Sequence, residues 1–142
     1  MIALATIWEL GWNTPLFEFD LWRFLVPEFQ VDGGLWVTPV SGIVAPADFP
    51  LYERATVPAI LEELGVIGVF LDQDGDIPLD EFEHPASCVY LTGATSYPIL
   101  PYKRQGDVSV RVRTPAGAGG PWSHQIACLA LYDRQVKSWP QP

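Results

Sequence analysis

The C-terminal third of the chain, from Ser87 to Trp139, places the strongest constraint on the fold. It divides into a predicted strand over 87–94, a loop over 95–107, a second strand over 108–115, a glycine-rich loop over 116–122 and a closing helix over 123–139. The first strand is almost wholly apolar, as expected of a strand covered on both faces. The second alternates valines with Ser109 and two arginines, so one of its faces should be buried and the other exposed to water.

The closing helix is too apolar to have one face in water. Ser123 can serve as its N-cap, and every residue from Ile126 to Tyr132 is apolar. Such a helix needs cover from its own sheet on one side and from something else on the other, such as a second copy of the chain. We therefore expect a homodimer.

The N-terminal residues predict a β-α-β pattern with a parallel sheet. A buried strand over 2–8 precedes a helix over 16–26, for which Thr14 is the predicted cap and Pro15 the first-turn residue. This helix should end near Pro27, because proline disrupts a helix interior. Gly33 and Gly34 then turn the chain into a second strand over 35–40.

The middle of the chain predicts four more segments: a loop over 41–56 with a helical turn after Asp48, a helix over 57–64, a third strand over 67–72 and a short helix over 77–85. Gly65 is a natural end for the second helix. The pattern predicts an α/β fold, a mostly parallel sheet with helices on both faces, formed by residues 1–142 as a single domain.

Composition restricts the function. Of the 142 residues 49% are hydrophobic, and the net charge is −9 with only eight Lys and Arg. A protein that binds nucleic acid chiefly through phosphates normally carries a basic face, so this balance counts against a general nucleic-acid binder. One local basic strip exists, formed by Lys103, Arg104, Arg111 and Arg113. It is either an RNA contact or ordinary surface charge.

Other features favour a cytoplasmic protein. No apolar run approaches the length of a membrane span, and the start of the chain lacks the basic region of a signal peptide. Cys88 and Cys128 lie in apolar segments without metal-ligand spacing, which predicts buried free thiols.

An acidic loop near the middle of the chain suggests a calcium site at first sight. Asp72, Asp74, Asp76 and Glu83 stand at positions 1, 3, 5 and 12 of an EF-hand loop. Position 6, which requires glycine, is Ile77, and the preceding segment is a predicted strand. We interpret this loop as a surface turn and expect no metal site.

The order of the C-terminal elements, with a last helix that ends in ACLALYDRQ, resembles the SPOUT class of trefoil-knot RNA methyltransferases. Gly93 matches the glycine of a turn that follows a strand in that class, whereas Thr95 and Pro98 replace its glutamate and later glycine. The class has a Ser-Leu-Asn phrase where this chain has Gly120, Pro121 and Trp122. Asn13, Arg23 and the run over 27–39 resemble the early motif, with Arg23 one residue out of register.

The resemblance implies a C-terminal trefoil knot and S-adenosylmethionine as the cofactor. It places the cofactor loops at Leu71, Thr92, Gly93, Thr114 and Gly119. Arg23 and Asn13 take the catalytic positions, for methyl transfer to an RNA ribose 2′-hydroxyl. The basic strip would then contact RNA.

Two other interpretations stay open. The missing signature residues and the acidic charge favour a non-catalytic relative that keeps the fold and the dimer and acts as a binding or structural module. The chain could also be an unrelated small α/β domain with an aromatic interaction surface.

Overall fold

A computed structural model describes residues 1–8, 15–39, 51–94, 96–116 and 123–140. The elements, in chain order, are β1 (Ile2–Trp8), α1 (Pro15–Glu28), β2 (Leu35–Pro39), β3 (Leu51–Glu53), α2 (Val57–Leu64), β4 (Ile67–Asp72), β5 (Ile77–Pro78), the 3-10 turn η1 (Leu79–Glu81), β6 (Cys88–Thr92), the 3-10 turn η2 (Leu100–Tyr102), β7 (Val108–Arg111) and α3 (Ser123–Ser138).

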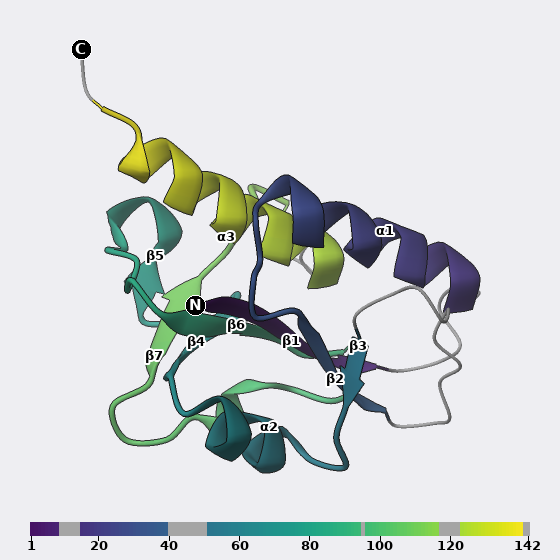
Figure 1. Cartoon of the computed structure of the whole chain (residues 1–142). Coiled ribbons are helices and arrows are strands. Elements are labelled where there is room, and N and C mark those ends of the chain that lie inside the picture. Colours follow the sequence, from purple (N-terminus) through teal and green to yellow (C-terminus); the bar gives the residue numbers. More distant parts are fainter. Residues whose placement is uncertain (9–14, 40–50, 95, 117–122, 141–142) are drawn as a thin grey trace.

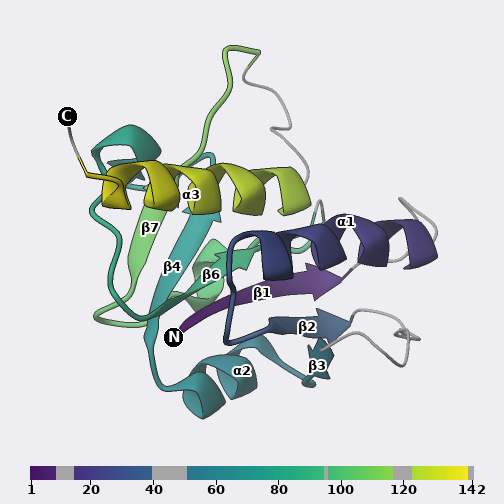
Figure 2. The ribbon, with the colours of Figure 1, turned by 45° about the horizontal axis from the view of Figure 1, so that its top comes forward.

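The strands form a seven-stranded sheet in the order β3-β2-β1-β6-β4-β7-β5. Each neighbouring pair runs parallel. Helices α1 and α3 cover one face of the sheet and α2 covers the other (Figures 1 and 2). The predicted fold class, a mostly parallel α/β sheet with helices on both faces, is confirmed.

Two hydrophobic cores fill the spaces between these layers. The core beneath α1 and α3 contains Trp22 and Leu131, packed on sheet residues such as Leu4 and Val110. The core beneath α2 contains Ile60, packed on residues of the opposite sheet face. Because neighbouring strand residues face opposite ways, the near-continuous apolar runs of β1 and β6 serve both cores.

The predicted helix over 16–26 extends to Glu28 and includes Pro27. Proline removes one backbone hydrogen bond of the helix, but the Phe29 N–H still donates to the Leu25 carbonyl at 3.1 Å. Leu25 and Val31, both buried, anchor this end of the helix. Burial therefore outweighs the effect of proline in the last turn.

The predicted loop over 41–56 contains β3, which pairs with β2. The helical turn expected after Asp48 is wrong from Leu51 on, because Leu51–Glu53 form a strand; residues 49 and 50 fall outside the described residues. A short helix was also expected over 77–85, but the structure has β5 and the single turn η1 there. Both misassigned segments contain a short strand that pairs with a longer one, β3 with β2 and β5 with β7. Local sequence does not reveal such pairing.

Strand β7 lies between β4 and β5, which are joined by residues 73–76. This link crosses β7 so closely that a Cβ on Gly75 would lie 2.3 Å from the Val110 carbonyl carbon. The Asp76 N–H donates to the Ser109 hydroxyl at 2.9 Å. The expectation that Ser109 lies on a water-facing side is therefore wrong, because the link buries it.

The expected C-terminal trefoil knot stays a prediction, and residues 117–122 of this part of the chain fall outside the described residues. Cys88 is buried and Cys128 is half-buried, and both are free thiols. None of the described helices is long and apolar enough to span a membrane.

Candidate functional site

The carboxyl ends of β6, β4 and β7 lie side by side at one edge of the sheet. Leu71 is in register with Val110, and Phe70 is in register with Leu91. The chain builds β1, β2 and β3 toward one side, then crosses to β4, and β6 fills the position between β1 and β4. Ligands of open parallel sheets bind beyond the carboxyl ends of the strands, where the strand order reverses. The structure thus brings Leu71, Thr92 and Gly93 to this edge, with Thr114 following β7.

A tight turn follows β6 at this edge. Ala94 and Tyr97 exchange two backbone hydrogen bonds of 3.0 Å each. A Cβ on Gly93 would lie 2.7 Å from the Tyr97 carbonyl oxygen, so the turn requires glycine at this position. The Thr92 hydroxyl donates to the Thr6 hydroxyl at 3.0 Å inside the protein. The side chain of Thr92 is therefore already bonded, and the turn offers mainly its backbone to a ligand.

The start of α3 is attached to the same turn. The Ser123 hydroxyl donates to the Gly93 carbonyl oxygen at 2.5 Å. From the sequence Ser123 was expected only as a helix cap. No pattern of nearby residues indicates a bond across 30 positions, so sequence reasoning missed this contact. It joins the turn after β6 to the helix that follows the glycine-rich loop.

The four basic residues of the predicted strip do not form one surface. Arg104 lies before β7, where its guanidinium contacts both oxygens of Asp107 at 2.9 and 3.0 Å. Lys103 is exposed beside it. Arg111 and Arg113 lie at the carboxyl end of β7, where Arg113 donates to the Gln73 carbonyl at 3.1 Å. None of the described residues forms a hydrogen bond or an ion pair with the guanidinium of Arg111.

Asp107 takes part in a set of hydrogen bonds at the amino edge of the sheet, where the strands begin. The carboxyl edge, where the strands end, lies opposite. Burial opposes the ionisation of Asp107, but hydrogen bonds from Arg104 and from the backbone N–H of Gly68 hold the pKa of its carboxyl below the usual value. The hydrogen bond to Asp107 raises the pKa of Arg104 in turn. The charge of Arg104 is thus neutralised within the fold and is a poor candidate for contact with RNA.

The predicted catalytic residues cannot be placed as a pair. Asn13 and the cofactor-loop residue Gly119 fall outside the described residues. Arg23 is half-buried on α1. At 3.6 residues per turn it lies about 200° around the helix from Leu21, which lines a groove against α3. Arg23 itself is not one of the residues that line that groove.

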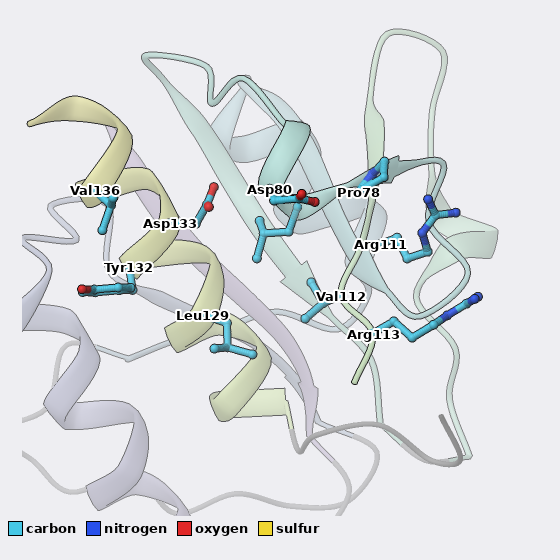
Figure 3. Close-up of a pocket in the computed structure, with 10 residues that line it drawn as sticks. Pro78, Asp80, Arg111, Val112, Arg113, Leu129, Tyr132, Asp133 and Val136 are labelled. Atoms are coloured by element: carbon cyan, nitrogen blue, oxygen red, sulfur yellow. The ribbon is translucent and has the colours of Figure 1, made fainter. Parts of the chain in front are cut away.

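Two grooves flank α3, and Leu129 lines both. One, of about 530 Å³, is lined by Pro78, Leu79, Asp80, Arg111, Val112, Arg113, Leu129, Tyr132, Asp133 and Val136. In Figure 3 the guanidinium groups of Arg111 and Arg113 point away from α3. The other, of about 540 Å³, lies between α1 and α3 and is lined by Asp20, Leu21, Phe24, Leu25, His124, Gln125, Cys128 and Leu129.

A polar network that sequence reasoning missed lies beneath α3. The two ring nitrogens of His84 lie 2.7 Å from the Tyr90 hydroxyl and 2.7 Å from Asp133. Lys137 also contacts Asp133 at 2.7 Å, and Arg134 donates to the Pro85 carbonyl. Burial lowers the pKa of His84 and raises that of Tyr90. His84 and Asp133 are 49 positions apart, so only the fold reveals the pair.

The network has a structural role, because Tyr90 is 1% exposed and cannot reach a substrate. It attaches the segment before β6 to α3. Among the described residues, no three His, Cys, Asp or Glu side chains converge as metal ligands would.

No protein-family model matches the chain, and neither does any curated protein. Solved structures do match. The SpoU methyltransferase AviRb from Streptomyces viridochromogenes, in complex with AdoMet, is 15% identical over 97% of this chain and 58% of its own, with a TM-score of 0.73. An AdoMet-bound rRNA methyltransferase from Sinorhizobium meliloti is 12% identical over 98% of this chain and 56% of its own, with a TM-score of 0.68.

A structure from work on 2-OH methylation of C/U34 on tRNA is 13% identical over 96% of this chain and 89% of its own, with a TM-score of 0.66. This chain thus spans little more than half of two of these proteins and most of the third. At such identities the likeness shows the fold alone: the mostly parallel α/β fold expected from the sequence is the fold that these solved structures share.

Proposed function

We propose that this chain, which has the fold of the SPOUT methyltransferases, transfers a methyl group from S-adenosylmethionine to a ribose 2′-hydroxyl of RNA. One observation carries the proposal. The turn after β6, the end of β4 and the end of β7 share one edge of the sheet, and Ser123 attaches α3 to that turn. Three chain segments thus converge where a parallel sheet binds its ligands.

The residues at this edge suit a cofactor that is held by backbone groups and apolar walls. Leu71 is 2% exposed and Thr92 is 1% exposed, so both support the edge from within. Gly93, Ala94 and Thr114 are half-buried and remain accessible from outside. The proposed cofactor supplies an electrophilic methyl group on a sulfonium, and these backbone segments would orient it.

The 2′-hydroxyl must lose its proton when its oxygen accepts the methyl group. Arg23 and Asn13 are the residues that the resemblance assigns to this step. A guanidinium is better suited to orienting or stabilising the oxygen than to removing its proton. In the proposed reaction the sulfonium C–S bond would break to leave S-adenosylhomocysteine, and water would take the proton. Arg111 and Arg113 lie at the same edge as the cofactor loops and are the proposed phosphate contacts.

A homodimer is part of this proposal. Leu129, Tyr132 and Val136 form an exposed apolar row on α3, at 45%, 55% and 36% exposure, and Phe24 on α1 is 59% exposed. All three residues of the row line the first groove, and Leu129 lines the second as well. A second copy related by a two-fold axis could place its own row in one of these grooves. Light scattering at micromolar concentration should give twice the 15.8 kDa chain mass. The chain mass alone would refute the dimer.

The main alternative is a non-catalytic relative that keeps the fold. The net charge of −9 favours it, as do the residues that replace the class signatures. The two proposals differ in one assay, incorporation of labelled methyl from S-adenosylmethionine into total RNA. Incorporation that Arg23→Ala abolishes, with unchanged affinity for S-adenosylhomocysteine, supports the enzyme. No incorporation by the wild type, despite binding of S-adenosylhomocysteine, supports the non-catalytic relative.

A further inference from the structure

The five tyrosines of the chain differ in what their rings contact. Tyr90 is buried in the polar network. Tyr52 stacks on Trp36, with ring centroids 4.6 Å apart and an interplanar angle of 21°. Tyr132 meets the edge of Trp139 at 6.4 Å. Three of the five rings are thus engaged within the protein.

The other two rings are Tyr97, at 40% exposure, and Tyr102, at 39%. Within the described part of the chain, neither ring contacts another ring or forms a side-chain hydrogen bond. Both belong to the segment between β6 and β7, but at different ends of it. Tyr97 closes the turn at the carboxyl edge, whereas Tyr102 lies in η2, a few residues before the Arg104–Asp107 pair of the amino edge.

The backbone of Tyr97 is held on both sides. Its two hydrogen bonds to Ala94 close the turn, and Pro98 restricts it to an extended conformation. Two positions later, Ile99 is 1% exposed and anchors the segment in the core beneath α2. An aromatic residue fixed in this way loses little conformational freedom when a ligand stacks on it.

We infer that Tyr97 is the platform on which the target nucleobase stacks while its ribose faces the cofactor loops, an inference that rests on the proposed function. Gly93 packs against the carbonyl of Tyr97, so the platform and a cofactor segment belong to one turn. RNA-binding proteins commonly stack unpaired bases on aromatic rings. With a net charge of −9, this chain attracts phosphates weakly, and stacking supplies affinity that salt screens little.

The test compares Tyr97→Ala with Tyr97→Phe and with Tyr102→Ala, the matched control of equal exposure on the same segment. Fluorescence anisotropy with single-stranded RNA oligonucleotides measures RNA affinity, and calorimetry measures affinity for S-adenosylhomocysteine. Tyr97→Ala should weaken RNA binding roughly 5- to 100-fold. Tyr97→Phe, which keeps the ring, and Tyr102→Ala should stay within about twofold of the wild type.

Unchanged RNA affinity of Tyr97→Ala would overturn the inference. An equal loss of RNA affinity in Tyr102→Ala would also overturn it. So would a Tyr97→Ala variant that loses affinity only for S-adenosylhomocysteine, because the ring would then contact the cofactor. Wild-type protein that binds S-adenosylhomocysteine but no RNA would refute the proposed function and the platform together. If the wild type methylates RNA and Tyr97→Ala methylates and binds it equally well, the platform alone is refuted.

Discussion

The two edges of the sheet use their polar groups in different ways. At the amino edge the groups are bonded within the chain: the ammonium of Met1 donates to Ser87, the Ile2 N–H donates to Asp32, and Asp107 accepts from Gly68 and Arg104. At the carboxyl edge Ser123 and Arg113 also bond within the chain, but the guanidinium of Arg111 has no hydrogen-bond or ion-pair partner among the described residues. We infer that the amino edge stabilises the fold and that the carboxyl edge is the binding edge of the proposed function.

The largest effect should come from Asp107→Ala. Its side chain is 4% exposed and accepts from both Arg104 and backbone N–H groups, so its removal leaves buried donors without a partner. We expect a loss of about 3 kcal/mol in the free energy of unfolding, measured by urea denaturation. Asp74→Ala, whose side chain is 70% exposed, is the matched control and should change it by less than about 0.5 kcal/mol. Equal effects would contradict the structural role of the amino edge.

A second effect concerns pH and His84. Because burial lowers the pKa of His84 in the folded state, the unfolded chain takes up the proton first. The contribution of the neutral His84 ring to the free energy of unfolding is fully present above the unfolded-state pKa of about 6.5. It is lost as the pH falls through the folded-state pKa, by at most roughly 1.4 kcal/mol per pH unit. Urea midpoints between neutral and mildly acidic pH should therefore fall, and His84→Gln should flatten the profile. A wild-type profile without this fall would show that the network does not disfavour the protonated ring.

The smallest effect separates the two ends of β7. Arg111→Ala should weaken RNA binding and reduce the salt slope of the affinity by about 1, because one phosphate contact is lost. Arg104→Ala, the same substitution at the amino edge, should leave the salt slope unchanged and lower the free energy of unfolding instead. If Arg104→Ala changes the salt slope as much as Arg111→Ala does, the division between the two edges is wrong.

The sequence predicted those elements whose signals are local. The apolar run of β1 and the helix between Thr56 and Gly65 carry their own patterns, and Thr56 caps α2 as such residues do. Strand β3 carries no such pattern, because three residues become a strand only by pairing with β2.

The candidate site shows the same limit. The resemblance predicted a turn with a required glycine at Gly93, which the structure has. The Ser123 contact and the His84–Asp133 pair, in contrast, join distant positions that no local pattern connects. The basic strip was predicted because its residues are close in the sequence. In the fold, Lys103 and Arg104 lie before the amino end of β7, whereas Arg111 and Arg113 lie at its carboxyl end. Whether a charge is available depends on partners such as Asp107, which the fold supplies.

We propose that the carboxyl edge of the sheet binds the cofactor and that the amino edge does not. Backbone amide chemical shifts, recorded by NMR during titration with S-adenosylhomocysteine, test it residue by residue. We expect shifts at Gly93, Ala94 and Thr114, with Gly68 and Asp107 unchanged. Shifts concentrated at Gly68 and Asp107, or no shifts at a millimolar concentration of the ligand, would contradict it.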